Sequence, residues 1–373
     1  MNSPLLGFFE LLKGFQDFSS MKVLMIIVGL VLIYLAIVKE YEPVLLLPIG
    51  FGCIVTNLPF SALTGEHGFL TLLYRTGIVT ELFPLLIFIG VGAMIDFSPL
   101  LSKPSLLVFG AAGQFGIFGT LILATLLGYP LPQAASIGII GAIDGPTAIY
   151  VSSKLAPELL APIAVAAYSY MSLIPIIQPP IMRLVTNQKE RTTQMAYVER
   201  PVSKSTRVIF PIGVTILVSI LVPEAAPLIS MLMLGNLLRE SGVVERLNQS
   251  AQNELINIAT LFLGLAIGST MKAENFIRLD TLIVLGLGLL AFSLDTLVGL
   301  LFGKFAYWIT KGRINPLIGA SGISAFPMAG RLAARMANDE NPNNFIIMQA
   351  MATNTAGQIA SVIAGGVLLA LLR

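Results

Sequence analysis

Long apolar runs separated by short polar segments are the main pattern along this chain. A helix needs about 20 apolar residues to cross the hydrocarbon core of a bilayer, so each long run is a candidate membrane helix. The pattern predicts an all-α protein that crosses the membrane many times. About twelve such runs are present, at residues 22–38, 43–60, 83–95, 104–128, 132–153, 157–185, 208–222, 226–238, 255–271, 282–308, 312–329 and 346–372.

Two segments lie outside these runs and have a different character. Residues 1–20 place apolar side chains at helical spacing, interrupted by three charged residues and without a small-residue cleavage site. We therefore expect an interfacial amphipathic helix here and not a signal peptide. Residues 187–207 carry five basic residues, partly offset by two glutamates. Because short basic loops favour the inner side of a membrane, we expect this connector to be cytoplasmic.

The segments on either side of the connector, 21–186 and 208–373, resemble each other weakly. The matches fall in order at a spacing of roughly 174 to 184 residues, which is typical of an internal duplication. We expect two transmembrane repeats and favour an inverted relation, although the sequence alone leaves the orientation open. The matched pairs are 88–94 with 262–271, 141–146 with 319–324, Gln114 with Asp295, and Tyr170 with Asn354.

Two apolar runs in corresponding places, 132–153 and 312–329, are interrupted by glycine, proline and polar residues. Such residues disfavour a continuous helix, so we expect both runs to be broken or re-entrant. Unwound backbone at membrane depth is tolerated only where protein or a water-filled cavity satisfies its polar groups. Paired interruptions of this kind indicate the binding site of a transporter.

Asp144 is the charged residue of the first broken run. It lies in an otherwise uncharged stretch, GAIDGPT. A carboxylate near the bilayer centre costs about 2.5–3.5 kcal/mol on insertion scales, so we expect it to bind a cation or accept a proton. The alternative is a cap on a broken helix end. We favour the functional role, because Ser or Thr would cap the helix without burying a charge.

Neutral oxygen-bearing side chains gather around the second broken run. A hard monovalent cation binds such oxygens, with few full charges so that it can leave again, and this favours sodium. Any one of these groups is equally well explained by hydrogen bonds between helices, and only their cluster favours a site. They belong to Asn315, Ser321, Ser324, Asn354, Thr355 and Ser361, while Gly319 and Gly322 leave carbonyls free to point inward.

Three further polar residues have two interpretations each. Tyr170 lies within an apolar run, where it would hydrogen-bond Asp144 or relay a proton, or simply pack. Asp295 is a second intramembrane carboxylate and therefore a functional candidate, but it ranks below Asp144 because it lies outside the broken runs. Arg331 closes the second broken run, where it would attract an anion or extend to the lipid headgroups.

Composition excludes several other classes of protein. The chain is 55% hydrophobic and 11% charged, with a net charge of +2, one cysteine and one histidine. A soluble core is excluded, and no basic patch indicates a nucleic-acid partner. A disulfide framework and His or Cys metal clusters are excluded as well. P-loop, GxSxG and dinucleotide motifs are absent.

Four long segments carry a resemblance to a known family. They are residues 141–186, 235–258, 315–331 (NPLIGASGISAFPMAGR) and 354–361 (NTAGQIAS). These segments resemble the beta subunit of the sodium-pumping biotin-dependent decarboxylases, whose members serve oxaloacetate, methylmalonyl-CoA, glutaconyl-CoA and malonate decarboxylases. The resemblance covers nearly the whole chain. The chain lacks the extended N-terminal region of the oxaloacetate type, which favours an acyl-CoA decarboxylase.

The resemblance implies a function, a location and partners. A soluble carboxyltransferase alpha subunit would move carboxylate from the substrate to a biotin carrier. This chain would then decarboxylate the carboxybiotin presented by that carrier, consuming a proton and exporting sodium ions across the cell inner membrane. A small gamma or delta membrane subunit and a homo-oligomeric assembly are implied as well.

The resemblance also implies site residues. Carried over motif by motif, sodium would be bound by Asp144, Asn315, Gly319, Ser324, Asn354 and Ser361. Catalysis would involve Asp144, Tyr170 and Arg331, with Tyr170 and Asp144 passing the proton. The alternative functions are a secondary transporter, sodium–proton or sodium–anion, without decarboxylase partners, and a membrane scaffold for soluble subunits.

Overall fold

The computed structural model describes residues 19–59, 62–195 and 201–372, and these ranges contain helices and no β-strand. The prediction of an all-helical membrane protein is confirmed. The interfacial helix expected at residues 1–20 lies almost wholly outside the described residues.

The elements follow in this order, with η marking short 3-10 or π segments. Before the connector they are α2 (Ser20–Val38), α3 (Pro43–Thr56), η1 (Ala62–Thr64), α4 (Phe69–Leu73), η2 (Tyr74–Val79), α5 (Leu82–Met94), α6 (Ser98–Ser102), η3 (Pro104–Leu106), α7 (Leu107–Ala112), α8 (Phe115–Leu126), α9 (Leu131–Gly138), η4 (Ile139–Ala142), α10 (Gly145–Leu155), η5 (Pro157–Leu159) and α11 (Leu160–Val185). From the connector onward they are α12 (Gln188–Arg191), α13 (Lys204–Leu221), η6 (Pro223–Ala225), α14 (Ala226–Ser241), α15 (Glu245–Ser250), η7 (Ala251–Leu255), α16 (Ile256–Thr270), α17 (Ala273–Phe276), α18 (Leu279–Ile309), η8 (Pro316–Gly322), α19 (Met328–Glu340) and α20 (Ile347–Leu372).

Seven helices in the described part of the chain are long and apolar enough to cross a bilayer. An eighth crossing results if Ala62–Val79 and Leu82–Met94 form one span, bent by 62°. The other apolar runs form shorter helices, such as α3 and α14, or broken segments. The seven are Ser20–Val38, Pro104–Leu126, Pro157–Val185, Lys204–Leu221, Glu245–Thr270, Leu279–Ile309 and Ile347–Leu372.

Both predicted helix breaks are confirmed. In the first, α9 ends at Gly138, η4 continues to Ala142, and a new helix, α10, begins at Gly145. In the second, η8 ends at Gly322 and α19 begins at Met328. Neither apolar run is therefore a continuous helix, because glycine lets the backbone turn and proline removes a helical hydrogen bond.

Small side chains fill the interior and large apolar ones cover the outside. The buried face of α20 consists mainly of Ala, Gly, Ser and Thr, together with a few larger side chains. By contrast, Leu126 on α8, Leu184 on α11 and Ile220 on α13 are 77%, 86% and 71% exposed. This distribution is typical of a membrane protein, whose helices pack closely through small residues while large apolar side chains face lipid.

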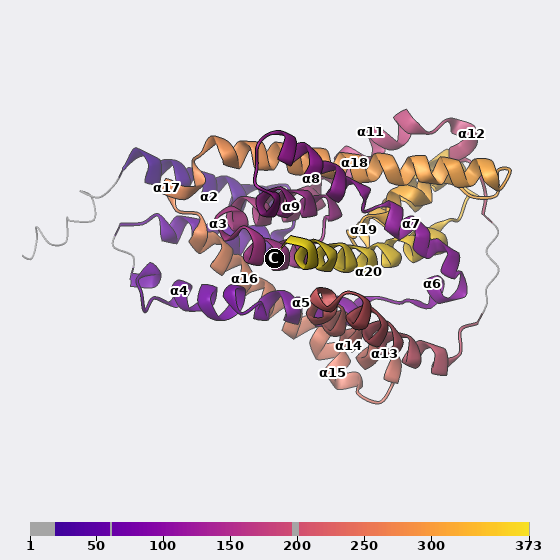
Figure 1. Ribbon diagram of the computed structural model, residues 1–373, viewed down its shortest axis with the longest axis horizontal. Helices are drawn as coiled ribbons and strands as arrows, with labels where there is room; N and C mark the ends of the chain where they lie inside the picture. Colours follow the sequence, from indigo (N-terminus) through magenta and orange to yellow (C-terminus); the bar gives the residue numbers. More distant parts are fainter. Residues whose placement is uncertain (1–18, 60–61, 196–200, 373) are drawn as a thin grey trace, which may run out of the picture.

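Figure 1 shows α18 along one long edge of the molecule and α20 through its middle. The helices α2, α3 and α16 gather at one end, and α12 lies at the other. The helix α18 packs on both broken segments, η4 and η8, and α20 packs on η8 and on α10. The two breaks are therefore enclosed between α18 and α20.

Two helix pairs join the part of the chain before the connector to the part after it. The helix α3 packs against α16, and α5 packs against α14. Each pair crosses at glycines, Gly52 and Gly268 in the first and Gly92 and Gly235 in the second. A methyl group at any of these four glycines would lie under 3.0 Å from a backbone oxygen of the partner helix.

Each of these pairs also has an asparagine that binds the end of its partner helix. Asn57, just after α3, donates to Met271 O (2.8 Å) and accepts from Ala273 N (3.0 Å). Asn236 on α14 donates to Ile95 O (2.9 Å). In both pairs an amide side chain therefore satisfies backbone groups that the end of a helix leaves without an intrahelical partner.

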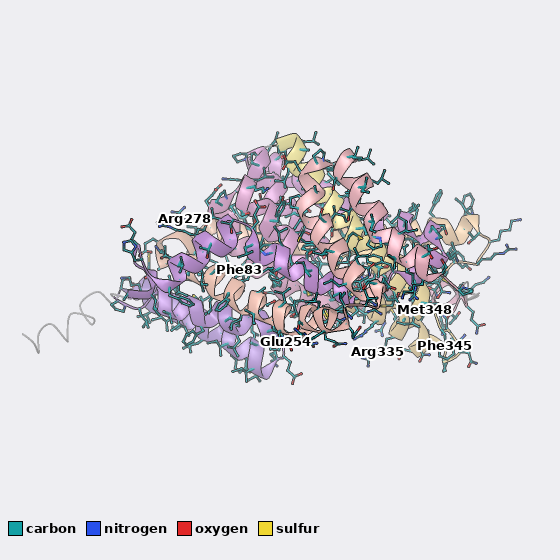
Figure 2. All side chains as sticks on the ribbon, turned by 90° about the horizontal axis from the view of Figure 1, so that it is seen from below. Phe83, Glu254, Arg278, Arg335, Phe345 and Met348 are labelled. Atoms are coloured by element: carbon teal, nitrogen blue, oxygen red, sulfur yellow. The ribbon has the colours of Figure 1, made fainter. Side chains whose placement is uncertain are left out.

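The two ends of the molecule carry different groups. Figure 2 shows Arg278 toward one end and Arg335 and Phe345 toward the other. The connector belongs to the second end, because Arg191 of α12 forms an ion pair with Glu340 at the end of α19 (2.8 Å). The last four residues assigned to the connector, 204–207, belong to the first turn of α13.

Candidate functional site

The first break positions a buried carboxylate at the start of a helix. After η4, Ile143 adopts a left-handed conformation (φ 50°) and Asp144 becomes the residue that caps α10. A β-branched residue in this conformation costs on the order of 1–3 kcal/mol and persists only where surrounding structure enforces it. The chain reversal places Asp144, which is 5% exposed, inside the protein.

The carboxylate of Asp144 accepts hydrogen bonds from two hydroxyl groups. Its Oδ2 accepts from Thr147 Oγ1 (2.7 Å) and from Ser361 Oγ of α20 (2.8 Å). Its Oδ1 accepts only a long bond from Thr147 N (3.5 Å). No ion pair to Asp144 occurs within the described ranges. The capping role considered from the sequence is present, and the N-terminus of α10 adds a favourable partial positive charge.

The second break meets the first at a backbone hydrogen bond. Ser324, just after η8, donates its N–H to Ala142 O at the end of η4 (3.0 Å). Its hydroxyl donates to Gly357 O of α20 (2.8 Å). The two broken segments, far apart in sequence, therefore lie side by side with α20 against both.

One face of α20 connects the second break to Asp144. Asn354 donates to Ser321 O (3.2 Å) and Ile323 O (2.7 Å), Gln358 donates to the carbonyl of Ser324, and Ser361 donates to Asp144. Spacings of four and three residues place these side chains along one face of a helix. A continuous polar strip therefore runs from η8 to the start of α10. On α20 this strip consists of Asn354, Gln358 and Ser361.

Asn354 Oδ1 on α20 and Ser321 Oγ on η8 are among the buried oxygens that have no hydrogen-bond partner within the described atoms, and both residues have no exposed surface. Buried polar atoms are nearly always paired, so unpaired ones need an explanation such as a bound ion or water. Both are neutral oxygens of the kind that bind a hard monovalent cation. Clusters of three or more His, Cys, Asp or Glu do not occur in the described residues.

The other residues predicted for the site lie elsewhere. Asn315 donates to Arg191 O and Thr193 O (2.9 Å each) and accepts from Leu317 N, so its amide joins η8 to the connector. Gly319 packs against Gly299 of α18. The structure brings Ser324, Asn354 and Ser361 together with Asp144, directly or through Gln358, and it does not bring Asn315 or Gly319 to them.

Tyr170 and Arg331 also lie away from Asp144. The hydroxyl of Tyr170 donates to Leu285 O of α18 (2.5 Å). Arg331 lies near the start of α19 with an exposed side chain. The tyrosine close to Asp144 is Tyr168, whose ring would overlap a methyl group placed on Gly145. Its buried hydroxyl has no partner among the described atoms.

Sequence reasoning missed Thr147, Tyr168 and Gln358. The spacing NTAGQIAS offered a signal for Gln358, because Asn354, Gln358 and Ser361 recur at helical intervals. Tyr168 had no such signal, since YSYM contains two tyrosines and periodicity alone does not say which one faces Asp144.

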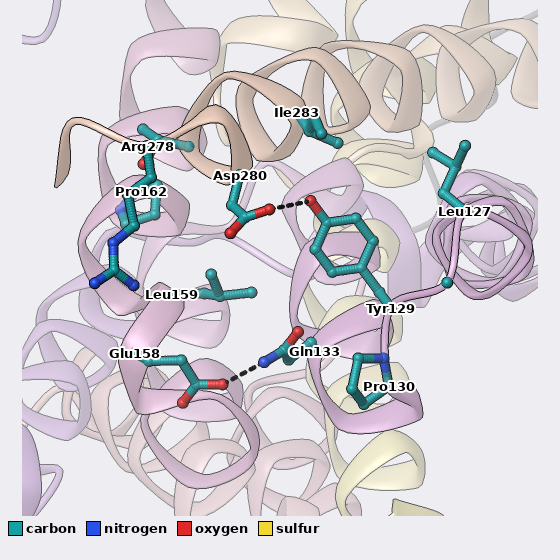
Figure 3. Close-up of a pocket in the computed structure, with 12 residues that line it drawn as sticks. Leu127, Tyr129, Pro130, Gln133, Glu158, Leu159, Pro162, Arg278, Asp280 and Ile283 are labelled. Atoms are coloured by element: carbon teal, nitrogen blue, oxygen red, sulfur yellow. Dashed lines mark hydrogen bonds between the residues drawn. The ribbon is translucent and has the colours of Figure 1, made fainter. Parts of the chain in front are cut away.

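A separate cavity of about 410 Å³ lies at the end of the molecule opposite the connector. Figure 3 shows Tyr129 directed at Asp280 (3.4 Å) and Gln133 at Glu158 (2.7 Å), with Arg278 beside them. Burial raises the pKa of Tyr129, and the nearby Asp280 carboxylate raises it further.

Comparison with known proteins places nearly the whole chain in one family. Residues 21–372 match the family described as Na⁺-transporting oxaloacetate decarboxylase beta subunit. The methylmalonyl-CoA decarboxylase subunit beta of Veillonella parvula is 50% identical over 360 residues, covering 96% of this chain and 95% of the relative. The glutaconyl-CoA decarboxylase subunit beta of Acidaminococcus fermentans is 49% identical over 360 residues, covering 96% of each.

A third relative aligns over a longer stretch. The oxaloacetate decarboxylase beta chain of Klebsiella pneumoniae is 44% identical over 417 residues, covering 95% of this chain and 96% of the relative. That alignment is longer than the 373 residues of this chain, so the relative carries additional residues within it.

Proposed function

The chain belongs to the family of beta subunits of Na⁺-transporting decarboxylases, and from this premise we propose how its own residues couple decarboxylation to sodium export. It is a multi-pass protein of the plasma membrane and a subunit of a biotin-dependent decarboxylase complex. In the proposed reaction a carrier presents carboxybiotin, the bond between the biotin nitrogen and the carboxyl carbon breaks, carbon dioxide leaves, and a proton replaces it on the nitrogen.

The proposed sodium site is centred on Asp144. Its ligands are the Asp144 carboxylate and the hydroxyls of Thr147 and Ser361, with Asn354 and Ser324 on the neighbouring strip. The observation that carries this proposal is a buried carboxylate at the meeting of two broken segments, with two hydroxyl contacts and no cationic side chain paired with it among the described residues. The roles expected for Asn315 and Gly319 stay predictions, because the contacts of these two residues are with the connector and with α18 and not with Asp144.

The same carboxylate is proposed to hold either sodium or a proton. Both neutralise a buried charge that otherwise costs several kcal/mol. Binding one therefore excludes the other, which provides exchange of sodium against a proton at one site. The participation of Tyr170 in proton transfer stays a prediction, and Tyr168 is the tyrosine adjacent to Asp144 in this conformation.

Arg331 is proposed to attract the carboxylate of carboxybiotin. It lies on α19, exposed to solvent, at the end of the molecule that carries the connector. Arg335 lies one helical turn further along the same helix and is exposed as well. An anion approaching this end would meet both guanidinium groups, which suits recognition of a carboxylate. This end would then face the cytoplasm, as predicted for the connector.

The partners are proposed to be a carboxyltransferase alpha subunit, a biotin carrier and a small gamma or delta membrane subunit, in a complex with more than one copy of this chain. We favour an acyl-CoA over oxaloacetate as the substrate of the complex. The methylmalonyl-CoA and glutaconyl-CoA relatives align with this chain over 360 to 382 residues, against 417 for the oxaloacetate relative, and therefore carry few or none of its additional residues.

The two halves, 21–186 and 208–373, are proposed to be repeats. Gly138 and Gly141 of the first break pack on α8 and α18, and Gly319 and Gly322 of the second pack on α18 and α7 in the corresponding order. The sequence alone matched Gly319 with Gly141. The packing matches Gly319 with Gly138 instead, which is a shift of three residues. Related halves of this kind allow a site to open alternately to the two sides of a membrane.

Sodium uptake into vesicles tests the proposed function. The whole complex is reconstituted, its acyl-CoA or oxaloacetate substrate is added, and the sodium that enters per carbon dioxide released is measured. Asp144→Asn should abolish uptake, because an amide neither balances the charge of sodium nor takes the proton. Asp96→Asn is the matched control, since Asp96 is exposed and accepts a backbone bond from Ser98 N (2.8 Å). Normal uptake by the Asp144 variant would refute the proposal.

A further inference from the structure

Asp295 is a second buried carboxylate that the proposed sodium site does not use. It lies on α18, has no exposed surface, and has no ion-pair partner within the described residues. An unpaired charge at this depth costs several kcal/mol, so the residue needs either a proton, a cation or a special environment.

The two oxygens of Asp295 have different surroundings. Oδ1 accepts the backbone N–H of Gly116 in the first turn of α8, where the helix leaves N–H groups without intrahelical partners. Oδ2 has no hydrogen-bond partner among the described atoms. The capping interaction therefore accounts for one oxygen and leaves the other bare.

The bare oxygen is directed at the first broken segment. A methyl group on Gly141 of η4 would lie 2.7 Å from Asp295 Oδ2, and one on Gly116 would lie 2.7 Å from its carboxyl carbon. The carboxyl group is thus enclosed between two glycines, one on α8 and one on η4. Only residues without a side chain leave room for it there. Asp144 follows Gly141 by three positions.

The other half of the chain has an uncharged group in the corresponding place. Gln114, at the break between α7 and α8, donates its Nε2–H to Gly322 O of the second broken segment (3.0 Å) and to Gly110 O (3.3 Å). Its side-chain amide therefore fixes the second broken segment with a hydrogen-bond donor. An ionised Asp295 has no donor for the first broken segment, whereas a protonated Asp295 has one.

We propose that Asp295 is a second proton-binding site, whose proton fixes the first broken segment against α18. In the protonated form, Oδ2–H donates to a backbone carbonyl of Ile139–Ala142. Loss of the proton to water breaks this bond and leaves a charge against the backbone, which releases the segment that ends at Asp144. Asp295 is a positioning residue, because it acts on the sodium site through the backbone.

No other titratable group is a hydrogen-bond or ion-pair partner of Asp295 within the described residues. The elements packed against α18 are α7, α8, α9, α11, η4 and η8. Of these only α11 carries titratable side chains, and Asp144 follows η4. The groups on α11 and on α18 itself are Tyr168, Tyr170, Arg183, Asp280, Lys304 and Tyr307.

Infrared spectroscopy of the purified complex tests whether Asp295 holds a proton. A buried protonated carboxyl group has a C=O stretching band that a carboxylate lacks. At saturating sodium, which keeps Asp144 ionised in the proposed site, we expect one such band at neutral pH in the unsubstituted protein and its loss in Asp295→Asn, while Asp96→Asn keeps it. Asparagine retains both the acceptor for Gly116 N and a donor for η4, so this variant should fold. A band that persists in Asp295→Asn would overturn the proposal.

Turnover tests whether the proton must leave. Asparagine cannot release its donor, so Asp295→Asn should slow sodium-dependent decarboxylation by about tenfold or more, and the rate should lose one inflection in its pH profile. Unchanged turnover with an unchanged pH profile would overturn the release step. This second test rests on the proposed function, whereas the infrared band requires neither decarboxylation nor transport. A failure of the sodium pump assignment would therefore leave the infrared result standing.

Discussion

Removal of one hydroxyl at Ser361 tests the proposed site most directly. In Ser361→Ala the carboxylate of Asp144 loses a 2.8 Å hydrogen bond and the proposed sodium ion loses an oxygen ligand. A hydrogen bond to a charged group contributes about 1.5–3 kcal/mol. Since 1.4 kcal/mol corresponds to a factor of about ten in an equilibrium constant, we expect the half-saturating sodium concentration to rise about tenfold to about a hundredfold.

The control for this change is Ser152→Ala. Ser152 is also buried and lies on α10, but its hydroxyl donates to Ala148 O (2.6 Å) within its own helix. Such back-bonding hydroxyls contribute little to a helix, so the sodium dependence of Ser152→Ala should stay within about twofold of the unsubstituted protein.

The assay is the initial rate of decarboxylation by the purified complex at increasing sodium concentration. The lost hydrogen bond also stabilised the ionised carboxylate, so Ser361→Ala favours protonation of Asp144 and the shift should be larger at lower pH, where protons compete with sodium more strongly. Equal sodium dependence of Ser361→Ala and Ser152→Ala would show that the hydroxyl of Ser361 is only a structural partner of Asp144.

Three further predictions follow from close contacts. Gly357→Ala should abolish transport and lower the unfolding temperature, since its methyl group would lie under 3.0 Å from Gly322 O; unchanged transport would refute this contact. Tyr168→Phe should keep or raise thermal stability, because it removes a buried hydroxyl that has no partner among the described atoms, yet slow turnover. Tyr170→Phe should instead lower stability by about 1 kcal/mol. Thermal unfolding and rate measurements together separate the two variants. Asn57→Ala should lower the free energy of unfolding by about 1–3 kcal/mol, because it removes the hydrogen-bond partner of two backbone groups near the end of α16. A fall in the unfolding temperature in detergent would reveal this loss.

The amino-acid sequence predicted the breaks better than the contacts at them. Glycine and proline in the two apolar runs were enough to exclude continuous helices, and a lone carboxylate at one break was enough to single out Asp144. Both inferences depend on local backbone preference and on the cost of a buried charge, which act over a few residues.

Which polar groups meet Asp144 depends on long-range packing, and the sequence did not determine it. Tyr168 and Tyr170 are two positions apart on a helix and therefore point to different sides of it. The structure places the first near Asp144 and the second on α18. Asn315 lies in the same motif as Ser324, yet its amide binds the connector, because η8 separates the two residues by a whole segment.

The corresponding places of the two breaks differ in charge, and this difference bears on coupling. When Gly138 is matched with Gly319, Asp144 corresponds to Ala325, a buried residue without charge. The proposed site therefore has one negative charge, which one sodium ion or one proton neutralises. A neutral site moves through a low-dielectric interior at low cost, whereas an empty ionised site does not. An empty site should accordingly stay on one side of the membrane until it binds a cation, which prevents a leak and obliges sodium leaving on one side to be exchanged for a proton.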